Sequence, residues 1–233
     1  MKSGPLQNLL VILLATASLA TTALLVLTMF RRGAATPRPE NSGIAESLEV
    51  RIPLPKFTLT ERSGQPVTLE SLKGKVWVAD FVFTRCAGPC PLMSAAMAKL
   101  QAALMDRGDR DSIRLVSFSV DPTYDTPEVL RDYADRFKAD PKFWLFLSGA
   151  RPEMWSLVKE GFKLPVFENT DNPLMPIGHS LSFVLVDKSG RIRGYYRGIA
   201  QRQADGSTAP AEMEALVSAV DRLLGESPED APQ

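Results

Sequence analysis

Apolar and polar residues divide the chain into four segments. Residues 9–30 form a stretch without a charged side chain, and residues 31–47 after it are polar and contain several prolines and glycines. Apolar and polar positions then alternate with strand and helix periods up to residue 225, and residues 226–233 are again polar. The pattern predicts an N-terminal membrane anchor over 1–30, a flexible linker over 31–47, one folded domain over 48–225 and a disordered tail over 226–233.

The uncharged stretch LLVILLATASLATTALLVLTMF is long enough to cross a membrane. Its 22 residues span roughly 33 Å as a helix, which covers the hydrocarbon core of a bilayer. The alternative is a cleaved signal peptide, for which Ala15-Thr16-Ala17 and Ala20 offer small residues at a cleavage site. The apolar stretch continues well past these alanines, which favours an uncleaved single-pass anchor.

The folded segment alternates between strand and helix patterns. Ser63-Gly64 separates two alternating runs and indicates a hairpin, and the apolar run 76–84 is typical of a strand buried on both faces. A helix is expected over 91–108, ended by Gly108. The further expected elements are strands at 113–120 and 143–147, helices from Thr126 and over 152–160, a hairpin around 188–190 and a last helix over 211–224. This order predicts an α/β fold, with a mixed sheet flanked by helices on both faces.

Composition limits the possible functions. The 233 residues contain 27 basic and 27 acidic side chains, so the formal net charge is zero and no basic stripe indicates nucleic-acid binding. Apolar residues make up 45 % of the chain, enough for a core without disulfides. The two cysteines, Cys86 and Cys90, are so close that a bridge between them would add little stability. The pair therefore suits chemistry better than cross-linking.

Cys86 and Cys90 lie where the predicted strand ends and the predicted helix begins. Backbone N–H groups at such a junction favour thiolate and lower a cysteine's pKa. Two thiols on one face can form a disulfide or hold a soft metal such as Cu(I). The alternative is a pair of small buried apolar residues. His179 is the one histidine of the chain and could be a third ligand, although a lone histidine taken by itself is more often structural.

Three motifs together resemble the SCO (SenC/PrrC) family: FVFTRCAGPCP, SVDPTYDTPEVLRDYADRF and GHSLSFVLVDKSGRI. The resemblance implies a thioredoxin-like fold with an inserted hairpin or helix. It also implies copper, as Cu(I), Cu(II) or both, bound by Cys86, Cys90 and His179, with Asp121 near the metal but not a ligand. The implied role is maturation of the CuA centre of cytochrome c oxidase subunit II, with a copper donor and a thiol reductant as further partners.

The resemblance also implies where the domain lies. Lys2 precedes the apolar stretch, and Arg31 and Arg32 follow it, so the positive charges do not decide the orientation and argue mildly for a cytoplasmic domain. Members of the family face the periplasm or the intermembrane space. The expectation is therefore an inner-membrane protein anchored by residues 9–30, with its globular domain in the periplasm.

Two other functions use the same cysteines. A thiol–disulfide oxidoreductase would reduce the cysteines of the target site, with His179 needed for nothing. A peroxidase on this fold is weaker, because peroxiredoxins have a threonine three residues before the reactive cysteine and this chain has Phe83 there. The metallochaperone is favoured over a turnover enzyme. Asp80, in an apolar strand, must be paired or lie near the site, and the second is favoured.

Three methionines lie near the motifs. Met93 and Met97 recur at helical spacing, so they are expected in the core first and near a metal only second. A long loop with three prolines is expected over 162–178, and it leads to His179. Met175 lies in this loop, which could bring it near copper. It is not assigned as a ligand.

Overall fold

The structure is a computed structural model that describes residues 51–172, 175–203 and 205–226. The predicted anchor, the predicted linker and the tail from residue 227 lie outside these residues. Within the described ranges, no helix has the length and apolar character needed to cross a membrane.

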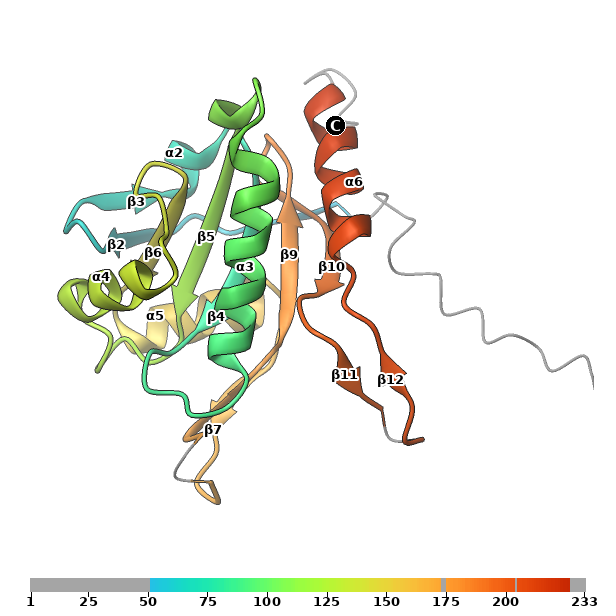
Figure 1. Cartoon of the computed structure of the whole chain (residues 1–233). Coiled ribbons are helices and arrows are strands. Elements are labelled where there is room, and N and C mark those ends of the chain that lie inside the picture. Colours follow the sequence, from blue (N-terminus) through green and yellow to red (C-terminus); the bar gives the residue numbers. More distant parts are fainter. Residues whose placement is uncertain (1–50, 173–174, 204, 227–233) are drawn as a thin grey trace, which may run out of the picture. The chain divides into compact units, whose positions relative to one another are not determined.

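A mixed sheet of eight strands forms the centre of the domain (Figure 1). The strands of the described residues are β1 (Ile52–Pro53), β2 (Thr58–Glu61), β3 (Pro66–Thr68), β4 (Val76–Val82), β5 (Ile113–Ser119), β6 (Trp144–Ser148), β7 (Val166–Glu168), β8 (Ile177–His179), β9 (Ser182–Val186), β10 (Arg191–Arg197), β11 (Gln201–Arg202) and β12 (Thr208–Ala209). The order across the sheet is β1-β10-β9-β4-β5-β6-β2-β3. Two hairpins, β7-β8 and β11-β12, form separate two-stranded sheets.

The central strands β4, β5 and β6 run parallel, and β9 pairs antiparallel with β4. All seven residues of β4, VWVADFV, are buried, as predicted for a strand covered on both faces. Because parallel strands end at the same edge of a sheet, the segments that follow β4 and β5 meet there. The cysteine segment follows β4, and the segment with Asp121 follows β5.

Helices cover both faces of the sheet. They are α2 (Leu69–Leu72), α3 (Cys90–Met105), η1 (Arg110–Ser112), α4 (Pro127–Arg136), α5 (Arg151–Ser156), η2 (Leu157–Gly161) and α6 (Met213–Gly225). Helices α3, α4 and α6 pack on one face through residues such as Met97, Leu130 and Leu216. Helices α2 and α5 pack on the other through Leu72 and Met154. Figure 1 shows α3 and α6 side by side in front of the sheet and α5 behind it. The predicted mixed sheet with two covered faces is confirmed.

Local signals in the sequence account for several boundaries. Gly64 takes a backbone φ of +84° in the turn between β2 and β3, a conformation that favours glycine. The Thr126 hydroxyl accepts a hydrogen bond from the backbone N–H of Val129, and Pro127 occupies the first helical position of α4. The predicted hairpin and helix start are both confirmed.

Two expectations about the fold are wrong. Gly108 does not end α3, because the helix stops at Met105 and Gly108 does not take the left-handed backbone of a glycine cap. The segment 162–178 is not a plain loop, because Val166–Glu168 and Ile177–His179 pair as β7 and β8. Strands of three residues carry too little pattern to be predicted, since they depend on each other for their hydrogen bonds.

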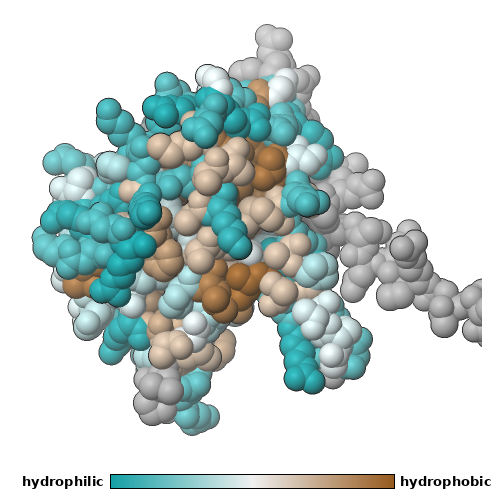
Figure 2. Space-filling view, in the orientation of Figure 1, coloured by the Kyte–Doolittle hydropathy of each residue, from teal (hydrophilic) through white to brown (hydrophobic). Residues whose placement is uncertain are grey.

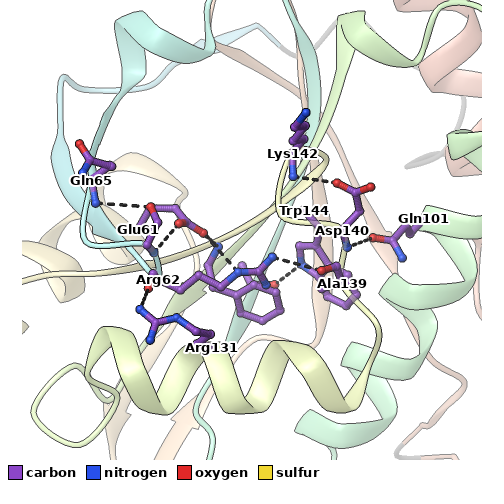
Figure 3. Close-up of polar contacts among 12 residues, drawn as sticks. Glu61, Arg62, Gln65, Gln101, Arg131, Ala139, Asp140, Lys142 and Trp144 are labelled. Atoms are coloured by element: carbon purple, nitrogen blue, oxygen red, sulfur yellow. Dashed lines mark hydrogen bonds and ion pairs between the residues drawn. The ribbon is translucent and has the colours of Figure 1, made fainter.

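A buried polar cluster ties β2 to β6 and α4 (Figure 3). Arg62 is only 5 % exposed, its Nη2 donates to the carbonyl of Ala139 at 3.2 Å, and its guanidinium lies over the Phe146 ring. A Glu61 carboxylate oxygen accepts from the backbone N–H of Phe146 at 3.3 Å, and Arg131 donates to the carbonyl of Arg62 at 2.8 Å. The cluster contains no cysteine or histidine and serves the fold.

Candidate metal centre

The two cysteines lie in the connection from β4 to α3. Cys90 is the first residue of α3, and Pro91 takes the next position, where a missing N–H costs nothing. Cys86 lies in the turn before the helix, with its N–H donated to the carbonyl of Phe83 at 3.3 Å. Both thiols are free and buried. The predicted position at a strand-to-helix junction is confirmed.

The two thiols interact and differ in acidity. The Cys90 thiol donates to the Cys86 sulfur, and so do the backbone N–H groups of Cys90 and Gly88, the latter at 3.3 Å. The bond from the Cys90 thiol is the main reason why the pKa of Cys86 falls from 9.0 to about 6, although burial acts in the opposite direction. The same bond, together with burial, raises the pKa of Cys90. Near neutral pH, Cys86 is therefore the thiolate and Cys90 the thiol.

His179 presents an unprotonated ring nitrogen to Cys90. Its Nδ1 lies 2.9 Å from the carbonyl oxygen of Ser180, and because a carbonyl only accepts, Nδ1 carries the proton. Burial lowers the pKa of His179, so the ring is neutral near pH 7 and Nε2 keeps its lone pair. Nε2 lies 3.2 Å from the Cys90 sulfur. A histidine that ligates a metal is held in this way, with one N–H on a carbonyl and the other nitrogen free.

The hairpin β7-β8 and the cysteine segment together position the imidazole. His179 ends β8 and pairs with Val166 of β7. The Phe83 ring, 1 % exposed, meets the imidazole edge to face with the ring centres 5.7 Å apart. Phe83, three residues before Cys86, thus helps to fix a histidine that lies 96 positions later in the chain.

Asp125 holds the start of the cysteine segment, and the sequence alone did not identify it. Its carboxylate accepts from the Thr84 hydroxyl at 2.5 Å and from the Ser119 hydroxyl at 2.6 Å. The Thr84 backbone N–H also donates to it, at 3.3 Å. Burial raises the pKa of Asp125, and these hydrogen bonds oppose that effect. Asp125 is the second aspartate of the motif SVDPTYD, and this was the only sign of its importance in the sequence. Its hydrogen-bond partner Thr84 lies 41 residues away, so no local pattern connects the two.

Asp121 reaches the site through an arginine. Its buried carboxylate accepts from Arg85 Nε at 2.6 Å, and the same guanidinium lies 5.2 Å from the centre of the Tyr124 ring. Arg85 directly precedes Cys86. Asp121 therefore lies beside the cysteine segment and fixes its backbone through Arg85.

Asp80 is fully buried and only half satisfied. Ser117 Oγ donates to one carboxylate oxygen at 2.5 Å and itself accepts from Trp144 Nε1 at 2.8 Å. The other oxygen, Oδ2, has no hydrogen-bond partner in the described part of the chain. Burial raises the pKa of Asp80 to about 7, and its charge contributes to the raised pKa of Cys90. Asp80 is thus both paired and within electrostatic range of the site.

The three candidate donors are gathered but do not yet surround a common point. Among the described residues, no group of three or more His, Cys, Asp or Glu side chains is arranged to hold a metal ion as it stands. The donor chemistry nevertheless fits a soft ion, because the site offers a thiolate, a thiol and a neutral imidazole. A groove of about 700 Å³ between Pro55–Leu59 and α5 has none of the three donors in its lining.

Three large apolar side chains are strongly exposed among the described residues, and each lies near a candidate ligand in the sequence or contacts the residue before one. Leu92, 60 % exposed, lies in the first turn of α3, two residues after the second cysteine. Tyr124, 50 % exposed, lies under Arg85, the residue before the first cysteine. The Phe167 ring, 54 % exposed, packs against Gly178, the residue before the histidine. Figure 2 shows apolar surface gathered over the end of α3 where the helix begins.

Of the methionines, Met93 and Met97 belong to the core as predicted. Both are fully buried and pack in the cluster on the face covered by α3, α4 and α6. Met175 is partly buried and packs against the other cluster, which includes Cys86 and Cys90.

Comparison with known proteins identifies relatives of the chain by sequence and by structure. The profile of the SCO1/SenC family matches residues 48–216. A SCO1 protein homolog of Bacillus subtilis is 37 % identical over 152 residues, which cover 64 % of this chain and 76 % of the relative.

Solved structures agree. BsSco, described as a member of the Sco family of cytochrome c oxidase assembly proteins with a disulfide switch, has a TM-score of 0.64 at 31 % identity, over 79 % of this chain and 99 % of that one. ScoI of Bradyrhizobium japonicum, solved with copper bound, has a TM-score of 0.58 at 26 % identity, over 73 % of this chain and 99 % of that one. The thioredoxin-like α/β fold is thereby confirmed, and the chain belongs to the SCO1/SenC family.

Proposed function

We propose that the protein is a copper chaperone that binds copper through Cys86, Cys90 and His179. Its role is to deliver copper to the CuA centre of cytochrome c oxidase subunit II, or to mature that centre in another way. The observation that carries the proposal is the unprotonated Nε2 of His179, which lies 3.2 Å from the sulfur of Cys90, and Cys90 is itself hydrogen-bonded to Cys86. The relative ScoI, solved with copper bound, supports copper as the cargo.

The protonation states favour uptake of a soft cation. Cys86 is already a thiolate near neutral pH because its pKa is about 6. Cys90 would lose its thiol proton on binding copper. Copper loading would therefore release a proton, and copper affinity would decrease at low pH. His179 gives up no proton, because its Nε2 is unprotonated and its Nδ1–H remains hydrogen-bonded to the carbonyl of Ser180. Thiolates suit Cu(I) and imidazole suits either oxidation state.

The surface around the ligands supports transfer to a partner protein. Cys90 is completely buried and Cys86 is 7 % exposed, so an acceptor must approach closely to take the ion. The exposed apolar side chains of Leu92, Tyr124 and Phe167 belong to the segments that carry the ligands or contact them, and they offer contact area for such a partner.

A second candidate is a thiol–disulfide oxidoreductase acting on the cysteines of the same oxidase site. The low pKa of Cys86 favours it, because a thiolate is the attacking species in disulfide exchange. The relative BsSco, described with a disulfide switch, points the same way. Attack by Cys86 on a target disulfide would form a mixed disulfide, and Cys90 would then resolve it, leaving the target reduced and this pair oxidised.

Cells expressing single variants distinguish the two candidates. A copper carrier requires His179, so His179→Ala should lower oxidase activity about as much as Cys86→Ser, and added copper should restore part of it by mass action. An oxidoreductase requires only the thiols. Full oxidase assembly with His179→Ala and none with Cys86→Ser would reject the carrier.

The proposal includes location and partners. Residues 1–30 anchor the protein in the inner membrane, and the domain faces the periplasm, where the oxidase site is assembled. The apolar stretch and the family's layout support this. A copper donor loads the site, and a thiol reductant keeps Cys86 and Cys90 reduced. Nucleic acid is not proposed as a binding partner. Protease protection in spheroplasts tests the orientation: the domain should be digested from outside, and a protected domain would refute it.

A further inference from the structure

A methionine sulfur lies next to the two thiols, in space left open by a glycine. A β-carbon placed on Gly88 would lie 2.3 Å from Met175 Sδ and 3.7 Å from Cys86 Sγ. The two sulfur atoms therefore lie no further apart than the sum of these distances, 6.0 Å. Any side chain at position 88 would displace the thioether, so the glycine of CAGPC is what admits Met175.

Met175 is held in this place by its own segment. Its backbone N–H donates to the carbonyl of Asn172 at 3.0 Å, and β8 begins two residues later and ends at His179. The side chain is partly buried against the apolar cluster that contains both cysteines. The β7-β8 hairpin thus brings the imidazole from its second strand, and the thioether from the connection before that strand, to the cysteine segment.

We propose that the Met175 thioether is a further copper donor, selective for Cu(I), in the site formed by Cys86, Cys90 and His179. The inference rests on the proposed function and extends it. A thioether is a soft, uncharged ligand that suits Cu(I) and adds little for Cu(II). A thioether also carries no proton. Its contribution to copper affinity therefore does not weaken as the pH falls, whereas those of cysteine and histidine do. Met175 would bias a site with mixed donors toward the reduced ion.

The test compares Met175→Leu with the wild type and with Met213→Leu, using the full-length protein purified in detergent. Leucine keeps apolar volume and removes only the sulfur. Met213 opens α6 and packs in the cluster on the opposite face of the sheet, so it is a matched methionine away from the ligands. Gly88→Ala is a second variant. Its added β-carbon displaces the Met175 sulfur from the site, although the methionine itself is still present in the sequence.

Affinity for each ion is measured by competition, with bathocuproine disulfonate for Cu(I) and with a Cu(II) chelator. We expect Met175→Leu and Gly88→Ala to lower Cu(I) affinity by about tenfold or more. Loss of a residue that only hydrogen-bonds a ligand already lowers metal affinity by about that factor. Cu(II) affinity should stay within about twofold, and Met213→Leu should match the wild type. X-ray absorption of the Cu(I) form should show one sulfur neighbour fewer in Met175→Leu.

The outcomes separate this inference from the function on which it rests. A wild type that binds no copper overturns both. Copper binding by the wild type with unchanged Cu(I) affinity and sulfur count in Met175→Leu overturns the Met175 donor alone. Equal losses of Cu(I) and Cu(II) affinity in that variant would show a packing role, and they too would overturn it.

Discussion

Replacing Asp80 by asparagine should remove a pH dependence of folding stability that the buried carboxylate creates. Asp80 is fully buried, with one oxygen bonded to Ser117 and the other without a described partner, and burial raises its pKa from 3.8 to about 7. Because the folded pKa is raised, the native state binds the proton more tightly than the unfolded chain does. The contribution to stability is complete below pH 3.8 and is lost as the pH rises through about 7.

The difference between the two pKa values corresponds to about 4 kcal/mol across that window, taking 1.36 kcal/mol for each pKa unit. Water penetration and relaxation reduce this figure, so it is an upper bound. It is nevertheless large beside a typical folding free energy of about 5–15 kcal/mol. Asparagine keeps the shape and the acceptor for Ser117 but does not titrate in this range.

The assay is urea unfolding of the reduced protein at intervals from pH 4 to pH 8. Wild-type stability minus that of Asp80→Asn should fall steadily as the pH rises, while Asp132→Asn, which alters an exposed carboxylate on α4, should run parallel to the wild type. Parallel curves for the wild type and Asp80→Asn would show that Asp80 titrates normally and would refute the reasoning.

The remaining predictions concern the cysteine segment and the carboxylates that hold it. Alkylation of Cys86 by iodoacetamide should follow a pH midpoint near 6, and Cys90→Ala should move it upward because the largest cause of the shift is gone; an unchanged midpoint would contradict the thiol–thiolate pair. Asp125→Ala should lower the free energy of unfolding by about 2–4 kcal/mol in chemical denaturation, because the buried Ser119 hydroxyl and the partly buried Thr84 hydroxyl lose their acceptor. Asp121→Ala should lower copper affinity, measured by chelator competition, by about 10- to 100-fold, which is less than the loss of any ligand would. An affinity equal to that of the wild type would show that Asp121 has only a structural role in its turn.

Elements with strong local signals were predictable from the sequence. Strand β4 is an unbroken apolar run, α4 begins with a threonine cap and a proline, and the β9-β10 hairpin surrounds Ser189-Gly190. Cys86 and Cys90 were identified for the same reason, since a strand-to-helix junction is a local pattern. The structure brings His179 to them, as the motifs implied.

The parts that could not be predicted depend on contacts between distant segments. The hairpin β7-β8 has strands of three residues, which exist only because they pair. The bond from Thr84 to Asp125 spans 41 residues, and no local pattern announces it. The role of Gly88 is visible only once Met175 is placed against it. Likewise, the tautomer of His179 follows from the carbonyl of Ser180 and not from the histidine's position in the sequence.

The central claim is that Cys86, Cys90 and His179 bind copper together, and a stoichiometric titration tests it most directly. The reduced wild-type protein and His179→Ala are titrated with copper, and both thiols are then challenged with an alkylating reagent. The account predicts one tightly bound ion per wild-type chain and protection of both thiols, because a coordinated sulfur is a poor nucleophile. His179→Ala should bind far more weakly yet still form the Cys86–Cys90 disulfide on oxidation. Equal copper binding and equal thiol protection in the two proteins would contradict the account.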